Sequence, residues 1–173
     1  MKFKSLLLCL LITLCISCEA TQTMHSHAST HTPDVEFPIP VGLVNDFDNI
    51  LSEEQETTLF NLVKQHEAET SNQIAIVTLT SIQDYSGLEE YSLDLANHWG
   101  IGQKDINNGV LIAVYMKDRR VWIHNGDGIM DKLTDDETLN ILKKTIVPEF
   151  KKNDFYSGFQ KGIKAIIDEL NSH

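Results

Sequence analysis

The stretch GVLIAVYMKDRRVWIHNGDG, residues 109–128, decides the fold of this chain. Its first half is apolar throughout, as expected of a strand that is covered on both faces. Its second half alternates, with Val121 and Ile123 on one side of the strand and larger residues on the other. The short charged link at Lys117–Asp118 predicts that the two strands form an antiparallel β-hairpin over residues 109–124.

A capped helix and a buried strand are predicted before the hairpin. Ser52 and Gln55 form a capping box at the start of a helix that should end near residues 70–72. The β-branched run over residues 73–80 then predicts a short strand.

Further helices are predicted on either side of the hairpin. Two more capping boxes, Ser86–Glu89 and Thr134–Glu137, mark their starts, and Gly100 ends the first of them. Pro148 either breaks the later helix or opens another turn, and residues 155–170 form a last amphipathic helix. This order of elements predicts an α/β fold, namely a three-layer α/β/α sandwich with a small mixed sheet and helices on both faces.

The N-terminal segment has the features of an export signal. Lys2 and Lys4 precede an apolar run over residues 6–16, which is too short to span a bilayer as a mature helix. The ending CISC resembles a bacterial lipobox, although that motif usually has Leu where this chain has a cysteine. We favour lipidation of Cys18 over an ordinary signal peptide cut near Ala20.

We therefore expect three parts: a signal peptide (1–18), a flexible tether (19–40) and a single folded domain (41–173). All three cysteines lie in the signal peptide, so the folded domain has neither a disulfide nor a cysteine nucleophile. The expected location is the periplasm, or the outer-membrane or cell surface for a lipoprotein. Membrane contact is expected only through the lipid anchor.

The charge balance narrows the classes of partner. The formal net charge is −11, and loss of the two lysines in residues 1–18 would make it −13. So acidic a protein repels nucleic acid and anionic lipid, and it attracts divalent cations. We expect a monomeric domain that binds no nucleic acid.

The hairpin predicts where a site would lie. In an antiparallel hairpin the start of the first strand lies beside the end of the second, so loops 105–109 and 124–128 should meet. Their oxygen-bearing side chains are Asp105, Asn107, Asn108, Asn125 and Asp127, with Asp131 close by. Such oxygens, without cysteine or clustered histidine, suit Ca²⁺ or Mg²⁺. The same residues are also ordinary turn formers, so the pattern alone leaves a metal site and plain turns open.

Four motifs together resemble one family. They are VNDFDNILSEEQ at residues 44–55, QIAIVTLTS at 73–81, EEYSLDLANHWGIGQKDINNGVLIAV at 89–114 and Gly-x-Gly at 126–128. In this combination the chain resembles the TPM domain family of secreted bacterial and thylakoid-lumen proteins over roughly residues 42–170. The run from Trp99 to the hairpin is the most specific part.

The resemblance implies an α/β/α sandwich. It also implies an acidic cleft that binds Ca²⁺ or other divalent ions in some members, and a weak acid phosphatase activity attributed to plant members. The family's first Asp falls on Asp46, its Asp-Asn-Gly on Asn107–Gly109 and its Gly-x-Gly on Gly126–Gly128. Many relatives have Asp where this chain has Asn107, which lowers the expected metal affinity unless Asp105 or another carboxylate compensates.

The favoured prediction is an accessory or protein-maintenance domain that binds Ca²⁺ or Mg²⁺ and acts through an unidentified envelope protein. Its predicted ligands are Asp46, Asp105, Asn107, Asn108 and Asp127. The alternatives are a weak metal-dependent acid phosphatase, with Asp46 or Asp127 as base, and an interaction module without a ligand. Arg119 and Arg120, the obvious phosphate-binding cations, should lie at the other end of the hairpin, which counts against the phosphatase. Catalytic residues, and whether the chain is an enzyme, stay open.

Overall fold

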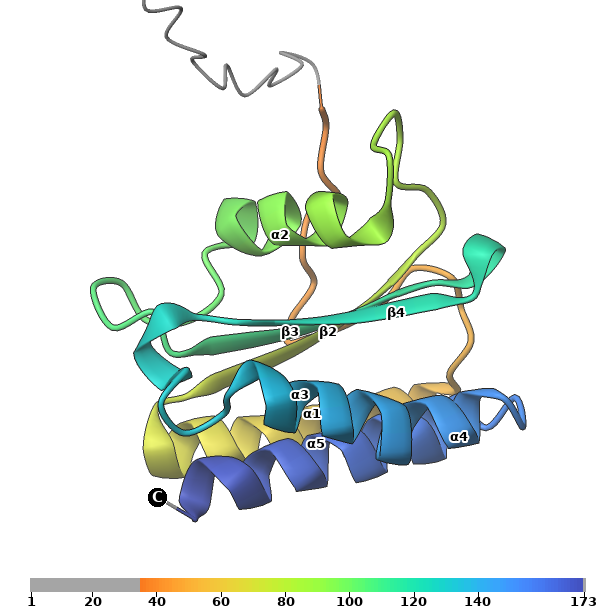
Figure 1. Cartoon of the computed structure of the whole chain (residues 1–173). Coiled ribbons are helices and arrows are strands. Elements are labelled where there is room, and N and C mark those ends of the chain that lie inside the picture. The colour runs from red at the N-terminus through yellow and green to blue at the C-terminus, as the bar shows by residue number, and fades with distance from the viewer. Residues whose placement is uncertain (1–34, 173) are drawn as a thin grey trace, which may run out of the picture. The chain divides into compact units, whose positions relative to one another are not determined.

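The computed structural model describes residues 35–172 (Figure 1). The strands are β1 (Val44–Asp46), β2 (Gln73–Leu79), β3 (Gly109–Tyr115) and β4 (Arg120–Asn125). The α-helices are α1 (Glu53–Thr70), α2 (Leu88–Trp99), α3 (Asp135–Ile141), α4 (Val147–Phe150) and α5 (Phe155–Asn171). The shorter helical segments are η1 (Met116–Asp118), η2 (Asp127–Ile129) and η3 (Leu142–Ile146). The predicted signal peptide, Cys18 and most of the tether lie outside the described residues.

The four strands form one mixed sheet in the order β1-β2-β3-β4. β1, β2 and β3 are parallel, and β4 is antiparallel to β3 with Ile112 opposite Ile123 at the centre of the hairpin. Helix α2 covers one face of the sheet, and α1, α3 and α5 lie on the other (Figure 1). The predicted three-layer α/β/α sandwich and its hairpin are confirmed.

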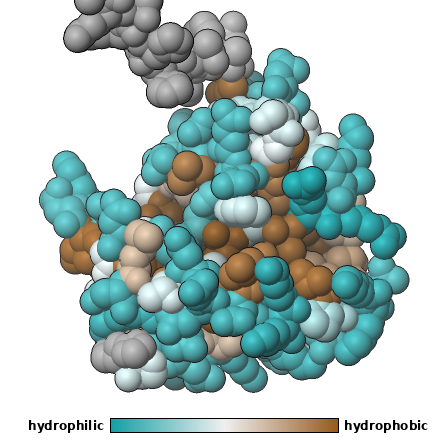
Figure 2. Space-filling model, in the orientation of Figure 1, coloured by the Kyte–Doolittle hydropathy of each residue, from teal (hydrophilic) through white to brown (hydrophobic). Residues whose placement is uncertain are grey.

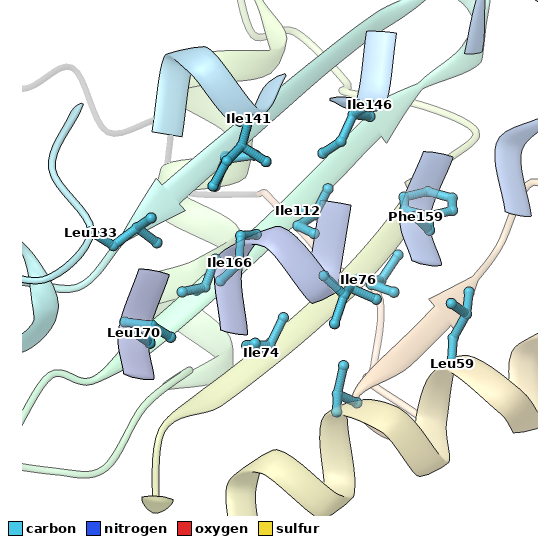
Figure 3. Close-up of a cluster of buried hydrophobic side chains, with 14 of the residues drawn as sticks. Leu59, Ile74, Ile76, Ile112, Leu133, Ile141, Ile146, Phe159, Ile166 and Leu170 are labelled. Carbon is cyan, nitrogen blue, oxygen red and sulfur yellow. The ribbon is translucent and has the colours of Figure 1, made fainter. Parts of the chain in front are cut away.

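Alternation along the strands divides the core between the two faces. Ile74 and Ile76 of β2 point to the α1 and α5 side, whereas Ala75 and Val77 belong to the core under α2. Figure 3 shows the larger core, where the β2 isoleucines lie near side chains of α5. Burying one such side chain contributes about 1.5–3 kcal/mol, so both faces hold the sheet in place.

Strand β1 was not predicted, because only Val44 of its three residues is apolar. Its central Asn45 is fully buried, and hydrogen bonds replace the apolar contacts that a strand usually makes. The Asn45 amide Nδ2 donates to the Gly42 carbonyl at 2.9 Å and to the Ile76 carbonyl at 3.3 Å. Its Oδ1 accepts from the Val41 N–H at 2.8 Å. A three-residue strand held in this way has no hydrophobic signature in the sequence.

The predicted helix starts are right in two cases and wrong in one. Ser52 and Thr134 both cap their helices through complete capping boxes. The Ser86–Glu89 box is wrong, because Gly87 is the N-cap of α2 and no side chain caps that helix. The Ser86 hydroxyl instead donates to the Glu90 carboxylate at 3.1 Å.

The later helical region changes pitch before Pro148, which was predicted to break the helix or to open another turn. The π-helical η3 leads into α4, which has the proline in its first turn. Proline has no N–H to donate and its ring would clash with the preceding turn, which accounts for the interruption. Within residues 35–172 no helix combines the length and the apolar character needed to cross a membrane.

Candidate functional site

The two loops at the open end of the hairpin meet, as predicted. We call this end the mouth, and it comprises residues 101–109 and 124–128. The Gly126 N–H donates to the Gly109 carbonyl at 2.8 Å, and the Gly128 N–H donates to the Asn107 carbonyl at 3.1 Å. These bonds continue the β3–β4 ladder beyond the strands.

The Gly-x-Gly motif is explained by this close backbone approach. A Cβ on Gly126 would collide with the Asn107 carbonyl, and one on Gly128 would collide with the Ile106 carbonyl. A backbone atom cannot yield as the end of a side chain can. Both glycines are therefore needed to join the loops, whether or not the mouth binds a ligand.

Asn108 has a structural role in the mouth. It is only 2% exposed, and its Nδ2 donates to the Ser71 carbonyl at 2.8 Å. Its Oδ1 accepts from the Gln103 N–H at 2.7 Å. This predicted ligand therefore ties the mouth to the end of α1, and both ends of its amide are already used.

Asn125 also points away from the mouth, toward α3. Its Nδ2 donates to the Leu133 carbonyl at 3.0 Å and to the Thr138 hydroxyl at 2.6 Å. Its Oδ1 is buried and has no hydrogen-bond partner among the described residues. The side chain fastens the segment after β4 to the first turns of α3.

A polar hollow of about 220 Å³ lies between the mouth and the C-terminal half of α2. Its polar lining residues are Asn97, Asn107, His124, Asn125 and Asp127. The hollow joins two predicted ligands, Asn107 and Asp127, with two residues that the sequence did not single out. Asn97 comes from α2 and His124 from the α2-facing side of β4.

His124 is held in place at the wall of this hollow. Its Nε2 lies 2.9 Å from the Ser92 hydroxyl and 3.1 Å from the Glu89 carbonyl, both on α2. Because a carbonyl can only accept, Nε2 carries the proton. Burial lowers the pKa of His124 below its usual value, so the ring is neutral near pH 7. A neutral ring does not repel a cation in the hollow.

Ser92 and His124 do not form a nucleophile and base. Ser92 is fully buried, and its hydroxyl donates to the Leu88 carbonyl at 2.6 Å. A substrate has no path to an oxygen enclosed in this way, and catalysis by serine needs an accessible one. The pair serves to dock α2 on β4.

The acidic residues of the mouth are exposed. Asp105 and Asp127 both lie at the surface, and Asp105 has a left-handed backbone with φ of 69°. Asp105 is on the same loop as Asn107 but does not line the hollow. Among residues 35–172 no group of three or more Asp, Glu, His or Cys side chains gathers as a metal cluster. A cation here would rely on a carboxylate, side-chain amides and carbonyls, which are the donors that Ca²⁺ accepts.

Asp46 lies at the opposite edge of the sheet from the mouth. It pairs with Thr78 of β2, which pairs with Val114 of β3, five residues from Gly109. Five residues of strand correspond to roughly 16 Å. The Asp46 carboxylate accepts from the Thr78 hydroxyl and from the Leu51 N–H at 2.7 Å. It therefore does not join Asn107 and Asp127 at the hollow.

The arginines also lie away from the mouth, as predicted. Arg119 follows η1 at the closed end of the hairpin, and Arg120 begins β4 there. In the register of the hairpin Arg120 pairs with Tyr115, whereas Asn125 pairs with Val110 at the mouth. A phosphate held near Asp127 would therefore have neither guanidinium within reach.

Comparison with known proteins gives a family and a fold. The family model described as the TPM domain matches residues 44–169. The solution structure of the N-terminal domain of a P. gingivalis protein is similar with a TM-score of 0.68 and 31% identity, over 75% of this chain and 82% of that one. No curated protein matches.

Two more distant solution structures share the fold. The BA42 protein from the psychrophilic bacterium Bizionia argentinensis has a TM-score of 0.64 and 23% identity, over 73% of this chain and 85% of its own. The N-terminal domain of the cg2496 protein from Corynebacterium glutamicum has a TM-score of 0.59 and 18% identity, over 78% and 84%.

Proposed function

Because the chain belongs to the TPM domain family, we propose that its mouth hollow binds a divalent cation, Ca²⁺ or Mg²⁺, in an accessory domain. The observation that carries this proposal is the convergence of Asp127 with the side chains of Asn97 and Asn107 on one hollow. A carboxylate and two amides supply hard oxygen donors, and the net charge of −11 favours a cation over an anion.

The donor set favours calcium and a weak affinity. Calcium accepts six to eight oxygens in a flexible geometry, whereas Mg²⁺ demands a near-octahedral shell that an open loop site supplies less well. One lining carboxylate gives little charge, so the dissociation constant should lie near the 10⁻⁴–10⁻³ M of extracellular calcium modules. Water completes the remaining positions in an exposed site.

An NMR titration of the amide groups tests the proposal. We expect Ca²⁺ at millimolar concentration to shift the signals of residues 97, 105–109 and 124–128, and Asp127→Asn to weaken binding about fivefold or more. Asp118→Asn is the matched control, because it removes the same charge from an exposed residue at the other end of the hairpin. An unchanged mouth spectrum at about 10 mM ion, roughly ten times the weakest dissociation constant expected, would refute the proposal.

The metal-dependent phosphatase is the second proposal, and it has less support. Asp127 could orient water beside a bound ion, but Arg119 and Arg120 lie at the other end of the hairpin. Hydrolysis of p-nitrophenyl phosphate by the protein with Ca²⁺ or Mg²⁺, compared with Asp127→Asn, tests it. Equal rates for the two proteins would exclude catalysis at the mouth.

We also propose that the domain works outside the cytoplasm, attached through Cys18 and acting on an envelope protein. The N-terminal sequence supports this, with its basic start, short apolar run and CISC ending. Metabolic labelling with palmitate should label the protein, and Cys18→Ala should abolish the label. Equal labelling of the two forms, or none in either, would contradict the lipid anchor.

A further inference from the structure

A second hollow, of about 240 Å³, is lined by residues from the closed end of the hairpin and from α4 and the loop after it. We call it the turn hollow. Its apolar lining residues are Val114, Met116, Val121, Val147, Phe150 and Phe155. Most of them are only partly buried, so they leave apolar surface open to solvent. Figure 2 shows that the face in view exposes apolar surface among polar groups.

The rim of the turn hollow is cationic. Arg119, Arg120 and Lys151 line it, together with Asn153. Ion pairs within residues 35–172 involve Lys64, Lys152 and Lys161, so none of the three rim cations has a carboxylate partner there. Arg120 also lines a neighbouring hollow on the α2 face, which leaves Arg119 and Lys151 as the cations specific to this one.

The two loops that carry these cations are well defined. Arg119 has a left-handed backbone with φ of 51°, and its N–H donates to the Met116 carbonyl at 3.1 Å. Asn153, on the α4–α5 loop, is left-handed too, with φ of 61°. A left-handed arginine is disfavoured relative to glycine or asparagine, and such residues gather at ligand-binding loops.

The floor of the hollow is aromatic. The Phe150 ring packs edge-on against Phe155 with centroids 5.2 Å apart, and against Phe159 at 5.1 Å. Phe159 is fully buried in the core, so the aromatic group is anchored from below. A ligand that lies on this floor would bury its apolar surface against aromatic rings.

We propose that the turn hollow binds a small organic acid, namely one carboxylate attached to an apolar group about the size of a phenylalanine side chain. A guanidinium fork matches a carboxylate, and Lys151 adds a second positive charge. The apolar floor favours a singly charged ligand, because burying a phosphate dianion there would cost more desolvation. The volume is below the roughly 300–1,000 Å³ of sites for drug-sized ligands, so the ligand is small.

The test compares an acid with its neutral analogue on the full chain. N-acetyl-L-phenylalanine should shift the amide signals of residues 114–121 and 147–155, and N-acetyl-L-phenylalaninamide should bind at least about fivefold more weakly. Equal binding of the two compounds, or no shifts in either segment, overturns the proposal. This comparison needs no variant, so it holds even where a substitution disturbs folding.

Two variants and one control test where the carboxylate of the ligand binds. Arg119→Gln and Lys151→Gln should each weaken binding of the acid about threefold or more and leave binding of the amide unchanged. Lys117→Gln is the matched control, because it removes a positive charge from the same turn but does not line the hollow. A loss in Lys117→Gln as large as in Arg119→Gln would mean a diffuse charge effect and would overturn the assignment.

The same chemistry could come from a free acid or from the C-terminus of a peptide. A pentapeptide ending in phenylalanine, tested with a free and an amidated C-terminus, separates these sources. Tighter binding of the free-ended peptide than of N-acetyl-L-phenylalanine assigns the hollow to peptide ends, and weaker binding assigns it to free acids. Loss of the preference for the free end in the peptide pair would contradict the proposal.

Discussion

The two ends of the β3–β4 hairpin differ in chemistry and in how they are held. At the mouth, backbone hydrogen bonds join two loops, and carboxylates and amides face solvent. At the closed end, side-chain packing forms an apolar hollow with a cationic rim. Both arginines of the chain lie at this second end, although the net charge is −11. The comparison shows that the local charge at one end of the hairpin can differ in sign from the net charge of the chain.

Adding one methyl group at each end of the hairpin tests how that end is stabilised. Gly128→Ala should cost about 3–4 kcal/mol of unfolding free energy, because its Cβ meets the Ile106 carbonyl. Gly158→Ala should cost only about 1–2 kcal/mol, because its Cβ meets the Phe150 ring, which can move toward the turn hollow. Urea unfolding measures both. A larger loss of unfolding free energy in Gly158→Ala than in Gly128→Ala would contradict this account, in which the mouth is held by backbone contacts and the closed end by side-chain packing.

The buried side-chain amide of Asn108 should contribute more to stability than the exposed amide of Asn97. Asn108→Ala leaves the Gln103 N–H and the Ser71 carbonyl without a partner, so we expect a loss of about 2–3 kcal/mol. Asn97→Ala, which removes the same group from an exposed position on α2, should change stability by less than about 0.5 kcal/mol. Similar losses in the two variants would show that Asn108 is not the clamp of the mouth.

Two histidines should make the fold sensitive to acid. Burial lowers the pKa of His66 and of His124 in the folded protein. As the pH falls, these histidines are therefore protonated at a higher pH in the unfolded chain than in the folded protein. The stability that is present above the usual histidine pKa is lost as the pH falls through the lowered pKa of the folded protein. We expect urea midpoints to fall between about pH 7 and pH 5. His124→Gln should flatten this dependence, whereas His98→Gln, at an exposed position, should leave its slope unchanged.

The smallest expected effect comes from adding a negative charge to the mouth. Asn107→Asp adds a carboxylate to the mouth, and the left-handed φ of 53° at this position suits either side chain. We expect about a three- to tenfold gain in Ca²⁺ affinity, with stability unchanged within about 0.5 kcal/mol. Calorimetric titration of the variant beside the wild type measures the gain. Weaker binding in the variant would place the cation away from Asn107.

Much of the fold follows from local patterns, and the exceptions have physical causes. The capping boxes, the β-branched run and the alternating hairpin predicted α1, β2, β3 and β4 because each leaves a periodic signal. Strand β1 was missed because hydrogen bonds of Asn45 replace apolar burial. The start of α2 was misassigned because Gly87 caps it without a side chain, whereas Ser86 contacts Glu90.

The mouth was predictable as a place but not as a set of side chains. Antiparallel pairing brings the loops together whatever their residues are, so Asn107 and Asp127 could be placed there from the sequence. Which way Asn108 points depends on the end of α1, and this contact lies 37 residues back in the sequence. Asn97 joins the hollow only because α2 docks over β4, which no local pattern encodes.

One double titration tests the central claim, that the two ends of the hairpin bind ligands of opposite charge. A single ¹⁵N-labelled sample is titrated first with Ca²⁺ and then with N-acetyl-L-phenylalanine. We expect Ca²⁺ to shift the signals of residues 97, 105–109 and 124–128 only, and the acid to shift those of residues 114–121 and 147–155 only. Shifts by Ca²⁺ at the closed end, or an unresponsive mouth, would contradict the claim.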